Sequence, residues 1–101
     1  MKFKVEKSFD KDLIKIKDKK LLQKIQNCLS QSEIVKNVHE IAGTKKIEGF
    51  SSFYRIKIGD YRLGLESVTD TEIILMRFLH RREVYRYFPK KKIGELRKNF
   101  K

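Results

Sequence analysis

The chain has 101 residues and carries 25 Lys and Arg against 13 Asp and Glu, which gives a net charge of +12. This length predicts a single domain over residues 1–101, able to bury only about two thirds of its unfolded surface. The charge favours a polyanionic partner, which is nucleic acid, an acidic protein or an anionic membrane.

A membrane role is disfavoured by the apolar pattern. No apolar run approaches the ~18 residues that cross a bilayer, and the N-terminus lacks the apolar core of a signal peptide. We therefore expect a soluble, cytoplasmic protein. Cys28 is the only cysteine in the sequence, which excludes an internal disulfide. Since no Cys/His cluster has the spacing of metal ligands, we expect neither a metal ion nor a cofactor.

The first half of the chain predicts one strand and two helices. Charged and apolar residues alternate over residues 1–6, as in a short strand. Ser8 is expected to cap a first amphipathic helix. A second is expected to start after Asp18 and to end near Ser30. Residues 31–50 fit either a short helix or a packed loop, and both remain open.

From Phe53 onward the apolar residues recur with period two, and turn signals follow at Gly59-Asp60 and at residues 69–71. Three strands are predicted, at about residues 52–58, 61–68 and 72–80. The third is apolar on both faces, which indicates an interior place in the sheet. The segment after Pro89 reads as a weak helix or a mobile tail. We therefore predict an α+β fold, β-α-α-β-β-β-α, with a mainly antiparallel four-stranded sheet, two N-terminal helices on one face and a short C-terminal helical segment.

The hairpin FYRIKIGDYRLGLE gathers cations on one face. A two-residue Gly-Asp loop pairs Lys57 with Arg62 and Arg55 with Gly64, while the alternate positions are apolar. Like charges placed opposite each other cost roughly 0.2–1 kcal/mol. Either the charges spread into water, or an anion such as a phosphate joins them, and we favour the phosphate site.

The third strand adds arginines to that face if the next turn has an even length. Arg62 then lies opposite Arg77, and Arg81 follows four residues further along. An odd turn or a bulge would instead move both arginines to the core side.

The segment FLHRREVYRYFP ends the third strand, and Glu83–Tyr87 can form one helical turn. Arginine forks bind phosphate and tyrosine rings stack on bases, which favours an RNA-binding edge near Arg81 and Tyr85. The alternative is that the aromatic residues pack the chain against the core, which we prefer for Phe88. Strand parity turns His80 away from Arg62.

The order of these elements, with the runs FYRIKIGDYRLGLE and EIILMRFLHRREVYRYF, resembles the RelE/ParE superfamily of toxins from bacterial and archaeal toxin-antitoxin systems. In its RelE-like members this resemblance implies a type II toxin that cleaves mRNA in the ribosomal A site. It also implies a cognate antitoxin as partner in a toxin-antitoxin hetero-oligomer, with ribosome and mRNA as targets. The basic segment after Pro89 is a candidate docking site for the antitoxin or for ribosomal RNA.

The resemblance carries five positions onto this sequence: Arg55, Lys57, Arg62, Arg81 and Tyr85. We expect Lys57, Arg62, Arg81 and Tyr85 to be catalytic and Arg55 to bind substrate. Three residues on or next to the third strand are further candidates for substrate binding: Arg77, Arg82 and His80. Arg55 departs from a lysine often found there, and an arginine stays charged where a lysine can give up its proton.

A metal-free cleavage would use the ribose 2′-hydroxyl as nucleophile and needs a base, charge stabilisation and an acid. Lys57 is the first candidate base, with His80 and Glu66 as alternatives. Arg62 would hold the charge of the phosphorane, and Arg81 would serve the leaving oxygen. Tyr85 would orient a stacked base.

Two other functions fit a basic protein of this class. A ParE-like toxin would block DNA gyrase by binding, and a non-catalytic module would bind RNA with a steep salt dependence. The set Lys57, Arg62, Arg81 and Tyr85 favours the nuclease.

Overall fold

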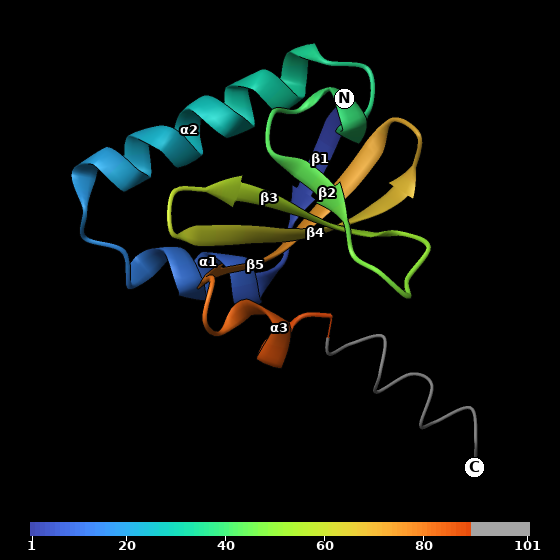
Figure 1. Ribbon diagram of the computed structural model, residues 1–101. Helices are drawn as coiled ribbons and strands as arrows, with labels where there is room; N and C mark the ends of the chain where they lie inside the picture. The colour runs from blue at the N-terminus through green and yellow to red at the C-terminus, as the bar shows by residue number, and fades with distance from the viewer. Residues whose placement is uncertain (90–101) are drawn as a thin grey trace.

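The computed structural model describes residues 1–89 and contains a five-stranded sheet in the order β1-β5-β4-β3-β2. The strands are β1 (Lys2–Val5), β2 (Thr44–Lys46), β3 (Phe53–Ile58), β4 (Tyr61–Thr69) and β5 (Glu72–His80). Only the β1–β5 pair is parallel (Figure 1). The α+β class is confirmed, but the expected four strands are one too few. The extra strand, β2, is too short for its alternation to stand out.

The helices are α1 (Lys7–Ile14), α2 (Lys19–Ile34), the 3₁₀ helix η1 (Val38–Glu40) and α3 (Val84–Tyr87). The helix α2 begins directly after Asp18, as predicted, and Asp18 caps it by accepting hydrogen bonds from the amides of Lys20 and Leu21. It ends at Ile34, four residues later than the predicted end near Ser30. The Ser8 cap is wrong, because α1 has Glu6 at its N-cap and the Ser8 hydroxyl donates instead to the Met76 carbonyl. The helix or tail expected after Pro89 lies outside the described residues.

The main core lies on the sheet face that α1 and α2 cover (Figure 1). Phe9 of α1 and Ile25 of α2 are buried there against Leu63, Leu65 and Phe78 of the sheet. Burial of each such side chain stabilises the fold by about 1.5–3 kcal/mol.

Cys28 packs at the edge of this core, and burial raises the pKa of its thiol, so little reactive thiolate is present near neutral pH. Within residues 1–89, no helix is both long and apolar enough to cross a bilayer.

A second, smaller core lies on the opposite face, where the hairpin pattern predicted only positive charge. Phe53, Met76, Val84 and Phe88 are buried together there, and α3 contributes Val84. The rings of Phe53 and Phe88 meet edge to face with centroids 5.5 Å apart. The predicted core position of Phe88 is therefore confirmed, and the cations occupy only part of this face.

Phe88 closes directly over Gly64, which leaves no room for a larger residue in β4. A Cβ atom at Gly64 would lie 2.7 Å from Phe88 Cδ2. We expect Gly64→Ala to lower the free energy of unfolding by about 1–3 kcal/mol, because the ring must move. Urea unfolding measures the loss, and Phe88→Leu in the same chain should recover part of it. A Gly64→Ala protein as stable as wild type would refute this packing.

The strand register follows the prediction in the hairpin and departs from it afterwards. Lys57 pairs with Arg62 and Arg55 with Gly64, as predicted. Arg62, however, lies opposite Leu79, and Arg77 lies opposite Gly64. The pairing of β4 with β5 shifts by one residue between Gly64 and Leu65 and shifts back between Ser67 and Thr69, so the two shifts cancel. Arg77 therefore stays on the Arg62 face, displaced by two residues along the strand.

Candidate functional site

The hairpin of β3 and β4 places cations side by side on the sheet face that carries α3. Lys57 is exposed and sits directly across from the half-buried Arg62. Arg62 Nη1 donates to the carbonyls of Gly59 and Tyr61, at 3.0 and 2.9 Å. These hydrogen bonds hold the Arg62 guanidinium over the hairpin turn. A lysine at this position could not make both bonds in the same planar arrangement, and its ammonium group would be more mobile.

Arg81 joins the same end of the sheet. Its amide donates to the carbonyl of Asp60 in the hairpin turn at 2.8 Å, which extends the β4–β5 ladder past the end of β5. Arg62 pairs with Leu79, so Arg81 lies two residues further along on the same face. The side chains of Arg81 and Arg82 are exposed. Lys57, Arg62 and Arg81 therefore form one group, the hairpin-end cations.

His80 faces the other way. It pairs with Tyr61 on the main-core face, with ring centroids 5.4 Å apart, and its Nδ1 accepts from the amide of Arg82 at 3.2 Å. The prediction that strand parity turns His80 away from Arg62 is confirmed. This geometry disfavours His80 as the base.

Tyr85 and Arg55 line a hollow of about 310 Å³ beside the hairpin, together with Lys45, Lys46, Ile47 and Glu48. Tyr85 is 58 % exposed, so its ring is free to stack on a ligand. Arg55 Nη1 donates to the Gly43 carbonyl at 2.9 Å. Lys45 and Lys46 were not predicted from the sequence, because they lie in the unassigned segment before the hairpin. The only signal was the TKK run, which is too short to predict a strand.

Comparison with known proteins decides the family. The model of the family described as the ParE toxin of the type II toxin-antitoxin system, parDE, matches residues 3–85. The chain belongs to this toxin family. Its resemblance to the RelE/ParE superfamily is thereby confirmed, and it is a toxin of the type II class.

Individual relatives agree with this assignment. The toxin is 38 % identical over 95 residues to Toxin RelE3 of Methanocaldococcus jannaschii, covering 88 % of this chain and 100 % of the relative. It is 34 % identical to a chain of the RelB-RelE antitoxin-toxin complex of Methanococcus jannaschii, with a TM-score of 0.72 over 85 % of this chain and 99 % of that one. The YoeB dimer of Staphylococcus aureus, 19 % identical, shares the fold, with a TM-score of 0.62 and coverage of 79 % and 95 %.

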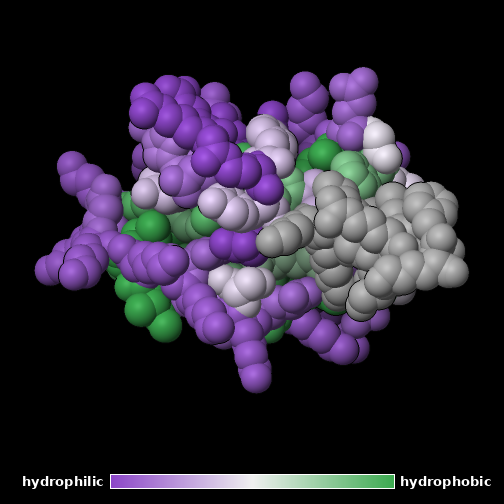
Figure 2. All heavy atoms as spheres, turned by 90° about the horizontal axis from the view of Figure 1, so that it is seen from below, coloured by the Kyte–Doolittle hydropathy of each residue, from purple (hydrophilic) through white to green (hydrophobic). Residues whose placement is uncertain are grey.

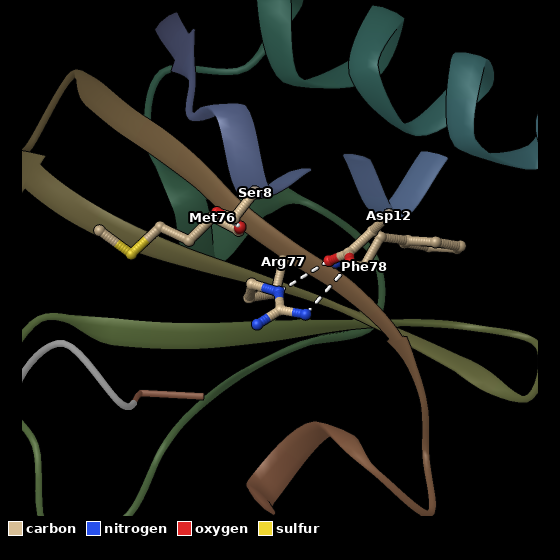
Figure 3. A network of polar contacts seen from close by, with 5 residues as sticks. All are labelled: Ser8, Asp12, Met76, Arg77 and Phe78. Carbon is tan, nitrogen blue, oxygen red and sulfur yellow. Dashed lines mark hydrogen bonds and ion pairs between the residues drawn. The ribbon is translucent and has the colours of Figure 1, made fainter. Parts of the chain in front are cut away.

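Arg77 of the toxin has a different environment from the hairpin-end cations. Its Nε and Nη2 donate to the Asp12 carboxylate at 2.8 and 3.1 Å, as Figure 3 shows. Its guanidinium also lies over the Tyr87 ring, 5.7 Å from the centroid. Because the Asp12 carboxylate already accepts two hydrogen bonds from the Arg77 guanidinium, the geometry does not support the expected substrate-binding role of Arg77. Arg77 instead connects β5 to Asp12 of α1 and to Tyr87 of α3.

The remaining acidic candidate is Glu66, whose Oε2 accepts from the Ser52 hydroxyl at 3.4 Å. Within residues 1–89, no three His, Cys, Asp or Glu side chains lie close enough together to hold a metal ion. Seen from the side on which α3 lies, the toxin is hydrophilic over most of its surface, with smaller apolar areas between the polar side chains (Figure 2).

Proposed function

We propose that this toxin is an endoribonuclease that cuts mRNA on the ribosome. The observation that carries the proposal is the grouping of Lys57, Arg62 and Arg81 at the hairpin end, on the same sheet face as the exposed Tyr85. Fixed cations around one phosphate stabilise the charge that develops when that phosphate is attacked, and such preorganised groups supply much of an enzyme's rate.

The reaction is an attack of the ribose 2′-hydroxyl on the adjacent phosphate. Lys57 takes the proton of the hydroxyl, and the equatorial oxygens of the phosphorane lie against Arg62. The charge on the departing 5′-oxygen is neutralised by Arg81, and this oxygen takes a proton from water, which balances the proton that Lys57 removed. The products are a 2′,3′-cyclic phosphate and a free 5′-hydroxyl, and no metal ion takes part. Exposed Arg82 adds a further contact to the RNA backbone.

A cognate antitoxin completes the proposal. One relative of known structure is the toxin chain of the RelB-RelE antitoxin-toxin complex of Methanococcus jannaschii, which supports a toxin-antitoxin hetero-oligomer here as well. With a net charge of +12, the toxin would bind most strongly to an acidic or amphipathic antitoxin segment that covers the hairpin-end cations. Such a segment would compete with mRNA for the same charges.

The rival function is inhibition of DNA gyrase, which the match to the ParE family model keeps in view. Two assays on the same purified protein separate the possibilities: cleavage of mRNA on programmed ribosomes, and gyrase-driven supercoiling of a relaxed plasmid. The nuclease proposal requires cut mRNA at the A-site codon and normal supercoiling. Intact mRNA with blocked supercoiling would reverse the assignment.

Tyr85 offers a test of the base-stacking role. Stacking of one base on an aromatic ring is worth about 1–3 kcal/mol, so Tyr85→Ala should weaken binding of single-stranded RNA about tenfold or more. Tyr85→Phe should bind nearly as well as wild type. Because the side chain is 58 % exposed, neither change should lower stability by more than about 0.5 kcal/mol. Equal RNA affinity for the alanine variant and wild type would remove Tyr85 from the site.

A further inference from the structure

The short helix α3 lies over a row of three residues that crosses the sheet. Arg55 of β3 and Arg77 of β5 both pair with Gly64 of β4, which places the glycine in the middle of the row. Phe88, directly after α3, closes over Gly64. The strand that α3 covers therefore has an arginine on each side.

Two side chains anchor α3, and two tyrosines flank them. Val84 and Phe88 lie four residues apart on one face of the helical turn and are buried in the second core. At about 100° per residue, Tyr85 and Tyr87 lie about 80° to either side of that face. Tyr87 lies on the β5 side, and Tyr85 borders the hollow on the β3 side. The direction of Tyr85 is therefore tied to that of Tyr87 through the rotation of one helical turn.

The Tyr87 ring depends on Arg77 for its position. The ring is 39 % exposed and a second hollow, of about 250 Å³, lies beside it, so packing alone leaves it room to move. The Arg77 guanidinium lies 5.7 Å from the ring centroid, within the range of a cation–π contact. Because a single helical turn is not stable on its own, one such contact strongly affects its orientation.

Asp12 makes the Arg77 guanidinium a rigid support for that ring. The carboxylate accepts from Nε and Nη2 at 2.8 and 3.1 Å, which fixes the plane of the guanidinium (Figure 3). The carboxylate is itself held in place, because it also accepts from the amide of Phe78. The support therefore belongs to α1 and β5 and does not follow the motion of α3.

We infer that Arg77 is a positioning residue: held by Asp12, its guanidinium fixes the Tyr87 ring and, through the rotation of α3, directs Tyr85 toward the RNA. This role rests on the proposed function, in which Tyr85 stacks on a base. Arg77 thus serves substrate binding without touching the substrate.

Tyr87→Ala tests this role without removing the Asp12–Arg77 ion pair. Tyr87 is partly exposed, so its truncation leaves the fold intact. A short, fully 2′-O-methylated RNA, which cannot be cleaved, is titrated with the full-length protein and followed by fluorescence anisotropy. We expect Tyr87→Ala to bind it about two- to fivefold more weakly than wild type, because losing the cation–π contact lowers the fraction of protein in the binding-competent state. Tyr87→Phe keeps the ring and should bind like wild type. Wild-type affinity in Tyr87→Ala would overturn the role.

A double-mutant cycle with Tyr85 separates positioning from direct contact. In a Tyr85→Ala background no ring is left to direct, so adding Tyr87→Ala should change the affinity by less than about 1.5-fold. If Tyr87 touched the RNA itself, the two losses of affinity would multiply. Multiplied losses would therefore overturn the positioning role.

Arg77→Lys separates positioning from a phosphate contact. Lysine keeps the positive charge but offers neither the planar fork for Asp12 nor a flat face for the Tyr87 ring. We expect Arg77→Lys to bind the same RNA about two- to fivefold more weakly than wild type, and to lose this difference in the Tyr85→Ala background. Wild-type affinity for Arg77→Lys would overturn the positioning role and favour a phosphate contact.

NMR relaxation of the Tyr85 amide tests the same role without RNA. We expect a rigid amide in wild type, with an order parameter of about 0.85, and a lower order parameter or microsecond-to-millisecond exchange in Tyr87→Ala. Identical relaxation in the two proteins would overturn the positioning role, whatever the toxin does to mRNA. The expected change in relaxation, in a toxin that leaves ribosome-bound mRNA intact, would support the role of Arg77 and refute the cleavage.

Discussion

Replacing Asp12 with alanine is expected to lower the free energy of unfolding by about 2–4 kcal/mol, somewhat less than breaking a fully buried ion pair, because the Arg77 side chain is 26 % exposed. Asp12 is only 5 % exposed and accepts three hydrogen bonds, from Nε and Nη2 of Arg77 and from the amide of Phe78 at 2.9 Å. In the alanine variant both the guanidinium and the amide lose their acceptor.

The position of this ion pair explains the size of the effect. β1 pairs with β5 only as far as Leu75, so the later residues of β5 have no neighbouring strand on that side. α1 takes the place of the missing strand: the Ser8 hydroxyl donates to the Met76 carbonyl and Asp12 accepts from the Phe78 amide (Figure 3). Two helix side chains thus satisfy backbone groups that an edge strand would leave unpaired.

Chemical unfolding of matched variants measures this contribution. Asp10→Ala removes an exposed carboxylate from the first turn of the same helix and should cost less than about 1 kcal/mol. Asp12→Asn keeps an acceptor and should fall between the two. If Asp12→Ala and Asp10→Ala unfold at the same urea concentration, the ion pair does not support the sheet edge.

The second large effect is expected at the reaction itself. Arg62→Ala should reduce the rate of mRNA cleavage by about 10²–10³, the usual loss when one preorganised charge donor is removed. Arg62→Lys keeps a charge but loses the fork that Gly59 and Tyr61 hold, and should recover only part of the rate. Cleavage on programmed ribosomes under single-turnover conditions measures both variants.

Folding must be separated from chemistry in this experiment, because Arg62 is half-buried and bonded to the hairpin turn. Urea unfolding of each variant shows whether the fold persists, and Lys24→Ala on α2 serves as a surface control with wild-type cleavage. A folded Arg62→Ala protein that cuts mRNA at the wild-type rate would remove Arg62 from the reaction.

The hairpin was predictable because a two-residue turn fixes its register. The pairing of Lys57 with Arg62 followed from local geometry alone. The turning away of His80 depended also on the parity of the next turn, which is even. The next turn was harder, since it falls one residue later than expected and displaces Arg77 by two positions, while the two bulges in the strand pair cancel each other. Bulges depend on what packs above the strand, and no local pattern announces them.

Other features depend on contacts between distant parts of the chain. Asp12 lies 65 residues before Arg77, so the sequence could not show that one carboxylate occupies this arginine. The strand β2 exists because β3 offers it a partner, while its own sequence gives little indication of a strand. Lys45 and Lys46 therefore escaped the prediction, although they border the hollow beside Tyr85.

The central claim is that the hairpin-end cations promote attack by a ribose 2′-hydroxyl, and one substitution in the RNA tests it most directly. Two mRNAs are compared on programmed ribosomes, one unmodified and one with a single 2′-deoxy nucleotide immediately 5′ of the scissile phosphate. We predict a 2′,3′-cyclic phosphate end from the first mRNA and no cleavage at that position in the second. Equal cleavage of both mRNAs would contradict it.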